Sequence, residues 1–143
     1  MEEKDKIKIN KILTEARNSI SDFCINECKA KCCKKGKLIL LNEKEVNFIC
    51  SNKKDKYLKR RVLKSTKDGN FTFNHERVKC PYLTKDNKCS EWKNPNRPKV
   101  CYDFPLFFSQ DKYIITAQIC PSVVNGKLNE YLEKLKKFGL KII

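Results

Sequence analysis

The sequence has no long apolar segment. Its longest apolar run is the four residues Leu38–Leu41, whereas a helix that crosses a bilayer needs about 20. The first ten residues, MEEKDKIKIN, are charged throughout and lack the apolar stretch of a secretory signal. We therefore expect a protein that works in the cytoplasm without membrane contact, in a compartment where thiols stay reduced.

Histidine is almost absent, since His75 is its one occurrence. A single histidine cannot supply a Cys/His zinc pattern alone, and we expect His75 to be a surface side chain. The sequence also lacks a phosphate-binding loop and an arrangement of nucleophile and base. We expect no catalytic activity of its own, and a metal- or cluster-dependent redox enzyme remains the alternative.

Cysteine, in contrast, occurs nine times in 143 residues. In a reducing compartment such a set indicates metal binding more than disulfides, although disulfides stay open as an alternative. Cys50 ends an apolar helical segment and is predicted to be a small buried hydrophobe. The other eight are the predicted metal ligands: Cys24, Cys28, Cys32, Cys33, Cys80, Cys89, Cys101 and Cys120.

The spacing of the first cysteines favours a shared centre. Cys24, Cys28 and Cys32 are four residues apart, so a helix through this stretch would place all three on one face. Cys33 would then point about 100° away, towards a second site or as a spare thiol. Eight thiolates suit two tetrahedral sites, one iron–sulfur cluster plus a zinc, or one cluster with structural thiols. Spacing alone does not choose among these.

Hydrophobic patterning predicts an α+β fold, a small single domain of helices and short antiparallel hairpins organised around a cysteine metal cluster. We expect an N-terminal amphipathic helix over residues 1–23 and a cysteine-cluster metal-binding domain over 20–122. A C-terminal helix over 123–143 is expected to pack on that domain.

Turn and capping residues predict the smaller elements. Asn42 with Glu45 three residues later predicts a capped helix that runs to Cys50. Thr84 to Lys88 are predicted to form a tight turn that brings Cys80 and Cys89 near each other. Strands are predicted over 37–41, over 57–63 and 71–73 as a solvent-facing hairpin, and over 106–109 and 113–118 as a second hairpin.

The formal net charge of +15 counts no thiolates, and eight of them would reduce it to +7. Part of the positive charge can therefore act as a field that eases thiolate formation. The basic run from Lys53 to Arg61 keeps a nucleic-acid-binding module with structural zinc as a further alternative, with Tyr57 as its one stacking residue. No protein partner is predicted.

The order of these motifs resembles the YkgJ-type cysteine-cluster family, a zinc- or iron-chelating domain named for its CxxCxxCC signature. Two departures are the x3 spacings here, where that signature has x2, and Tyr102 in place of the usual arginine. The residues that carry the resemblance are Cys24-x3-Cys28-x3-Cys32-Cys33, Asn42-Glu-Lys-Glu-Val46, Cys80-Pro-Tyr-Leu, Cys89, Arg97-Pro98, Cys101, Phe104-Pro105 and Cys120-Pro121.

The resemblance implies a bound metal, either a 4Fe-4S cluster or zinc. It favours iron–sulfur, because a similar module in flagellin lysine N-methylase is associated with such a cluster. Arg97 is predicted to stand behind the ligands, as a guanidinium that lowers the cost of thiolate charge. The alternative for Arg97 is a surface arginine in a rigid loop.

Overall fold

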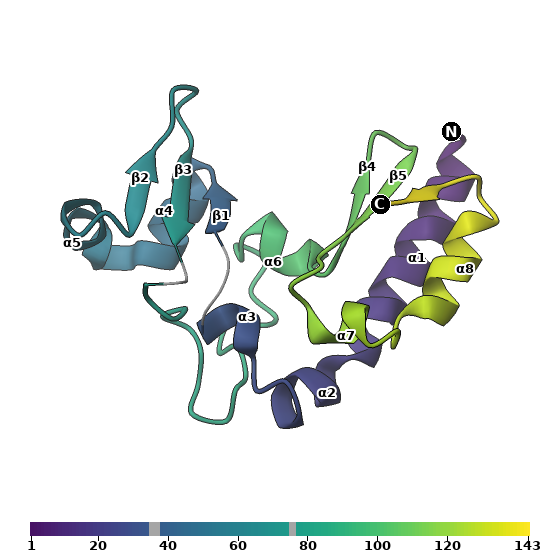
Figure 1. Ribbon diagram of the computed structural model, residues 1–143. Coiled ribbons are helices and arrows are strands. Elements are labelled where there is room, and N and C mark those ends of the chain that lie inside the picture. Colours follow the sequence, from purple (N-terminus) through teal and green to yellow (C-terminus); the bar gives the residue numbers. More distant parts are fainter. Residues whose placement is uncertain (35–37, 75–76) are drawn as a thin grey trace. The chain divides into compact units, whose positions relative to one another are not determined.

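The computed structural model describes residues 1–34, 38–74 and 77–143 (Figure 1). The chain divides into two compact units: unit 1 combines Met1–Cys28 with Asp103–Ile143, and unit 2 is Lys29–Tyr102. Each unit mixes helices with a small sheet, which confirms the predicted α+β class. Within the described ranges, no helix combines the length and the apolar character that a bilayer span requires.

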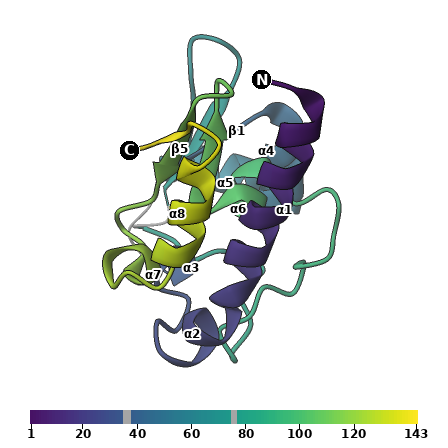
Figure 2. The ribbon, with the colours of Figure 1, turned by 90° about the vertical axis from the view of Figure 1, so that its right-hand side faces the viewer.

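Two helices from opposite ends of the chain form the core of unit 1. α1 (Glu3–Ser19) buries Ile9, Leu13 and Ala16, and α8 (Asn129–Lys136) buries Leu135 in the same cluster. Figure 2 shows α1 and α8 side by side. The predicted apolar stripes of both helices are therefore confirmed. The shorter α2 (Ser21–Asn26) and α7 (Pro121–Val124) complete the helices of unit 1.

A three-stranded sheet packs with these helices. β4 (Leu106–Ser109) and β5 (Tyr113–Thr116) form the predicted antiparallel hairpin, and β6 (Lys141–Ile142) runs parallel to β5. In the hairpin turn, Gln110 and Asp111 have φ values of 54° and 53°, as type I′ geometry requires. The side chains of Leu106 and Ile114 are buried in the same cluster as those of α1 and α8.

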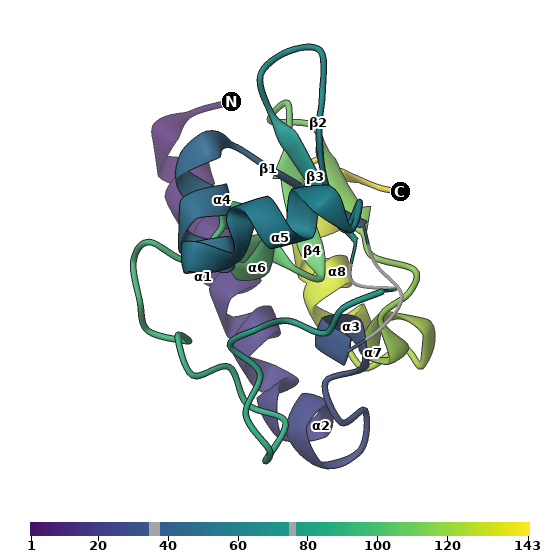
Figure 3. The same ribbon diagram turned by 90° about the vertical axis from the view of Figure 1, so that its left-hand side faces the viewer.

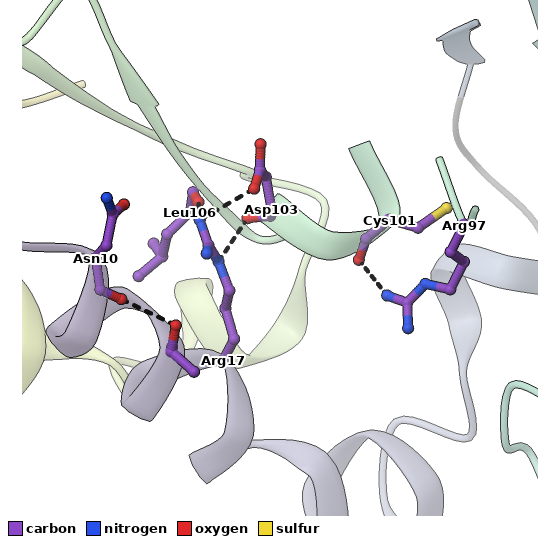
Figure 4. Close-up of polar contacts among 7 residues, drawn as sticks. Asn10, Arg17, Arg97, Cys101, Asp103 and Leu106 are labelled. Atoms are coloured by element: carbon purple, nitrogen blue, oxygen red, sulfur yellow. Dashed lines mark hydrogen bonds and ion pairs between the residues drawn. The ribbon is translucent and has the colours of Figure 1, made fainter. Parts of the chain in front are cut away.

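Arg17 fixes α1 to the chain that leads into β4. Its guanidinium donates to the carbonyl oxygens of Asp103 at 3.1 Å and Leu106 at 2.6 Å, and it lies 3.6 Å from the Asp103 carboxylate (Figure 4). Burial lowers the pKa of Arg17, and the charge of Asp103 opposes that shift. The arginine thus joins two segments of unit 1 that lie far apart in the sequence.

Unit 2 is a second small sheet with helices on one face (Figure 3). The strands β1 (Leu38–Leu41), β3 (Phe71–Asn74) and β2 (Leu63–Ser65) are antiparallel in that order. The core joins residues of the sheet to residues of the helices α4 (Glu43–Cys50) and α5 (Lys54–Lys59), and its buried members are Ile39, Leu41, Leu63, Phe73, Val46, Ile49, Cys50, Tyr57 and Val62.

Asn42 begins α4 with the predicted capping box. Its side chain accepts a hydrogen bond from the Glu45 amide at 2.8 Å, and the Glu45 carboxylate accepts one from the Asn42 amide at 3.0 Å. The remaining helical segments of unit 2 are α3 (Lys31–Lys34), the 3₁₀ turn η1 (Ser51–Lys53) and α6 (Lys99–Asp103), whose last residue belongs to unit 1.

The predicted strand over 57–63 is wrong, because residues 54–59 form the helix α5. Tyr57 is buried and packs edge-on against Phe73, with ring centroids 5.4 Å apart. The helix ends in a Schellman motif, in which the Val62 amide donates to the Tyr57 carbonyl and Arg61 has a φ of 58°. The chain then enters β2. The hairpin of β2 and β3 is not solvent-facing as predicted, since Leu63 and Phe73 are fully buried.

The continuous helix considered for Cys24 to Cys32 is absent from this described stretch. α2 ends at Asn26, and Lys29 and Ala30 both have positive φ values before α3 begins. Two left-handed residues cannot continue a right-handed helix, so the four-residue spacing does not place the three cysteines on one helical face. The boundary between the two units also falls here, between Cys28 and Lys29.

Within unit 1, α1 and α8 pack on each other and on Leu106 and Ile114, which lie inside the range 20–122. The metal-binding domain over 20–122 stays a prediction. His75 and the start of the strand predicted at 37 lie outside the described residues.

Candidate metal centre

The two units share the predicted ligands unequally. Unit 1 contains Cys24, Cys28 and Cys120, and unit 2 contains the other predicted ligands together with Cys50. The predicted ligands in unit 2 are Cys32, Cys33, Cys80, Cys89 and Cys101. Unit 2 therefore holds enough thiols for a complete four-cysteine site.

Main-chain contacts join Cys33, Cys80 and Cys89. The Cys80 amide donates to the Cys33 carbonyl at 2.7 Å, which ties the end of α3 to the Cys80-Pro81 segment. The Leu83 amide then donates to the Cys80 carbonyl at 3.1 Å and closes a turn. Leu83 forms an antiparallel bridge with Cys89 across the predicted Thr84–Lys88 hairpin. Cys33, Cys80 and Cys89 thus lie on one short path of main-chain contacts.

The same path continues from Cys89 to Cys101. The Trp92 amide donates to the Cys89 carbonyl at 3.3 Å. Arg97 then bridges the two ends of the following loop, with Nη1 donating to the Trp92 carbonyl at 2.9 Å and Nη2 to the Cys101 carbonyl at 2.7 Å. Figure 4 shows the contact with Cys101. Cys101 lies on α6, and its backbone amide donates to the Pro98 carbonyl. Four cysteines are therefore linked within unit 2 by backbone hydrogen bonds, the bridge between Leu83 and Cys89, and the side chain of Arg97.

Arg97 is buried, with 8 % of its surface exposed, so the surface-arginine alternative is wrong. Its guanidinium carbon lies 4.5 Å from the ring centroid of Trp92 and 4.6 Å from that of Tyr102. Cation–π contacts of this kind offset the loss of hydration of a charged group. The Tyr102 hydroxyl also donates to the Asn94 carbonyl, which holds the ring in place. Arg97 thus organises the loop between Cys89 and Cys101 through its backbone contacts.

The electrostatics of Cys80 place the four thiols near one another. The pKa of Cys80 is raised to about 11, first by burial and then by the charges of Cys33, Cys101 and Cys89, while a hydrogen bond from the Tyr82 backbone opposes the shift. Thiolates that repel one another in this way are the groups that a bound cation stabilises. At neutral pH without metal, Cys80 is a protonated thiol.

The four thiols do not form a closed coordination sphere. Among the described residues, no group of three or more Cys, His, Asp and Glu side chains is arranged so that it could hold a metal ion. The donors fit zinc or an iron–sulfur cluster in chemistry and number, since both accept four thiolates. Metal binding here would require the thiols to move together and lose their protons.

Cys50 is separate from this path. Only 1 % of its surface is exposed, in the core under α4, which confirms the predicted small buried hydrophobe. Burial raises the pKa of Cys50 to about 11, although the nearby charge of Lys54 opposes the shift. Cys50 is thus a matched control for the candidate ligands.

The cysteines of unit 1 lie in or near short helices. Cys120 is 5 % exposed and precedes Pro121, the first residue of α7, where proline fits without loss of a helical hydrogen bond. Cys24 lies in α2 after Phe23, and the Lys127 ammonium lies 4.7 Å from the Phe23 ring centroid. Their role as ligands stays a prediction. In the described part of the chain, the thiols of Cys28, Cys50, Cys80, Cys89 and Cys120 are free.

The sequence did not reveal two supports of the site. The Glu45 carboxylate caps α4 and also accepts a hydrogen bond from the Lys99 amide at the start of α6, at 2.8 Å. Tyr82 donates its hydroxyl to the Phe48 carbonyl at 2.5 Å and packs its ring 5.0 Å from that of Phe48. Glu45 was visible as a cap, but its contact with Lys99 spans 54 residues and leaves no local pattern.

Comparison with protein-family models, curated proteins and solved structures found no match to this chain.

Proposed function

We propose that the protein binds a metal through Cys33, Cys80, Cys89 and Cys101 of unit 2. The observation that carries this proposal is the path of main-chain contacts, with the side chain of Arg97, that links these four cysteines. Such contacts hold the backbone segments that carry the four ligands. The mutual repulsion felt at Cys80 supports the same set.

The bound group in this proposal is zinc or a 4Fe-4S cluster, and each takes four thiolates. Zinc would act as a structural cross-link, whereas a cluster would supply one-electron transfer. The protein's own residues hold the ligand loops: Arg97 fixes the carbonyl of Cys101, and the Cys80 amide fixes α3. Because burial and the neighbouring cysteines raise the pKa of Cys80 to about 11, metal binding at this thiol would release its proton and strengthen as the pH rises.

The resemblance to the YkgJ-type family favours the cluster and an eight-cysteine arrangement. Cys24, Cys28, Cys32 and Cys120 are the further ligands in that version of the proposal. The metal-to-protein ratio separates the two versions, since a second site doubles the zinc or iron content of the full chain.

The test is metal analysis of the full chain, purified without oxygen or chelator. Iron, zinc and acid-labile sulfide are measured per chain, together with the visible absorbance that marks an iron–sulfur cluster. Cys33→Ala, Cys80→Ala, Cys89→Ala and Cys101→Ala are each expected to lose roughly half or more of the bound metal, because a three-thiolate set binds more weakly.

Cys50→Ala is the matched control, because it removes a buried thiol from the same unit but not from the hydrogen-bonded path. It should keep the metal content of the unmodified chain. Circular dichroism on each variant verifies that the fold is retained. Full metal content in all four ligand variants, or an equal loss in Cys50→Ala, would refute the proposed ligand set.

A further inference from the structure

The positive charge of the protein is concentrated in one unit. Unit 2 has 21 lysines and arginines against seven aspartates and glutamates, a net charge of +14. Unit 1 has 11 against 10, a net charge of +1. The formal charge of +15 is therefore almost entirely a property of unit 2.

Thiolate chemistry does not account for this charge. Unit 2 contains six cysteines, and even if all six were ionised, a net charge of +8 would remain before any metal charge is added. A surplus of this size destabilises a folded unit through self-repulsion unless an anionic partner neutralises it. The surplus points to a partner outside the chain.

Seven of these cations form what we call the basic strip: Lys53, Lys54, Lys56, Lys59, Arg60, Arg61 and Arg77. Lys56 is followed three and four residues later by Lys59 and Arg60, so these side chains share one face of α5. Arg77 joins the strip because its Nη1 donates to the Arg60 carbonyl at 2.9 Å. All members except Lys54 are exposed, and Asp55 is the one carboxylate in the run 53–61.

The strip is not neutralised within the described residues. The ion pairs found there, those of Lys6, Arg17, Lys134 and Lys136, all belong to unit 1. Lys54 lies over the Phe71 ring at 5.1 Å. Among the residues that the structure describes, no carboxylate is therefore paired with a cation of the strip.

The same surface lacks the features of two other kinds of partner. Tyr57, the one aromatic residue of the run, is 6 % exposed, so it cannot stack on an unpaired base. Leu58, at 37 % exposure, is the one apolar side chain of the run that reaches solvent, so the strip offers little to insert into a lipid layer. Point charges without stacking or insertion suit a phosphate backbone.

We propose that unit 2 binds double-stranded nucleic acid through phosphate contacts of the basic strip, without reading the base sequence. The run 53–60 extends about 10 Å along the helix axis, a length over which a B-form duplex presents roughly six phosphates. This proposal is independent of the metal site, because no member of the strip belongs to the hydrogen-bonded path of cysteines.

The test is binding of the full, metal-loaded chain to a fluorescent 20-base-pair DNA duplex, titrated over a range of salt concentrations. The strip variant combines Lys53→Gln, Lys56→Gln and Lys59→Gln. The control variant combines Lys8→Gln, Lys11→Gln and Lys137→Gln, which removes the same charge from exposed positions of unit 1. Both variants should keep the melting temperature and metal content, because all six side chains are exposed.

The strip variant is expected to bind about 10- to 100-fold more weakly at about 0.1 M salt, with a salt slope smaller by roughly 3, because three phosphate contacts are lost. The control variant should change affinity by less than about threefold. Duplexes of different sequence should bind alike. Equal weakening in both variants, or tighter binding to anionic phospholipid vesicles, polyglutamate or single-stranded DNA than to the duplex, would overturn the proposal.

Discussion

At the residue scale, two side chains are buried in different charge states, since Arg97 is charged and Cys50 is neutral. Arg97 keeps its charge in a buried position because two carbonyls and two aromatic rings surround its guanidinium. Cys50 keeps its proton, because the loss of hydration in the core outweighs the opposing charge of Lys54. Substitution of Arg97 therefore tests the hydrogen-bond geometry of its guanidinium, whereas titration of Cys50 tests the effect of burial on its pKa.

Arg97→Lys should lower the free energy of unfolding by about 1–3 kcal/mol and weaken metal retention. Lysine keeps the positive charge but cannot donate to the Trp92 and Cys101 carbonyls at once in the same fork geometry. Urea denaturation and metal analysis measure the two effects. Arg77→Lys is the control, since Arg77 is exposed and, among the described residues, its guanidinium donates to one carbonyl, that of Arg60; it should cost less than about 1 kcal/mol. Equal costs for both variants would contradict the bridging role of Arg97.

The raised pKa of Cys50 predicts that the free energy of unfolding falls at high pH. Its pKa in the folded chain is about 11 against an ordinary value of 9.0, so the folded state holds this proton more tightly than the unfolded state. The contribution is therefore fully present below pH 9 and is lost as the pH rises from 9 through 11, by at most about 3 kcal/mol. In urea denaturation of the metal-free chain, Cys50→Ala should show a shallower decline over that range. An identical decline in both proteins would rule out the contribution of Cys50.

At the element scale, Glu45 connects two helices that are distant in sequence. One carboxylate oxygen closes the capping box of α4, and the other accepts the Lys99 amide at the beginning of α6. Because α6 carries Cys101, the anchoring of α4 extends to a candidate ligand. The sequence predicts the first contact only.

Glu45→Ala should lower the free energy of unfolding by about 1–3 kcal/mol, because it removes acceptors from two backbone amides. Glu45→Gln should cost less, since its single amide oxygen can still accept from Asn42 but no longer from both amides. Thermal denaturation of the two variants beside the unmodified chain measures the difference. If Glu45→Gln were as destabilising as Glu45→Ala, the second contact would not be independent of the capping box.

Local signals predicted several elements of both units. The periodic apolar residues of α1 and α8, the Asn42 cap and the hairpin of β4 and β5 all depend on neighbours in the sequence, and the structure confirms them. The helix α5 was mistaken for a strand because it is short and Arg61 occupies the left-handed position where glycine is usual. β6 has two residues and no pattern of its own.

The candidate site was predictable in residue type but not in partners. Cysteine density indicated the candidate ligands, whereas the grouping of Cys33, Cys80, Cys89 and Cys101 depends on contacts between segments up to 47 residues apart, as in the bond from Cys80 to Cys33. The positive φ values of Lys29 and Ala30, which interrupt the helix, could not be predicted from the sequence, since neither residue is glycine. Spacing in a helix was therefore the wrong guide to which thiols belong together.

At the scale of the whole molecule, the two units have separate cores. The cluster of Ile9, Leu13 and Leu135 belongs to unit 1, and that of Val46, Ile49 and Phe73 belongs to unit 2. Separate cores can open separately, so each unit is expected to have its own free energy of opening.

Leu135→Ala and Ile49→Ala form a reciprocal pair that tests this. Each removes a buried side chain and should cost about 2–5 kcal/mol in its own core. In native-state hydrogen exchange, Leu135→Ala should reduce the protection of amides in α1 and leave α4 unchanged, and Ile49→Ala should do the reverse. Loss of protection in both helices for either variant would show a single cooperative core.

Unit 1 is assembled from both ends of the chain, and this has a consequence for synthesis on the ribosome. The apolar face of α1 waits for α8, which begins at Asn129, while the residues of unit 2 are all translated in between. At a translation rate of about 5–20 residues per second, that wait is about 5–20 s. Unit 2 therefore matures first on the nascent chain, and α1 is the segment that a ribosome-associated chaperone would need to shield until α8 is synthesised.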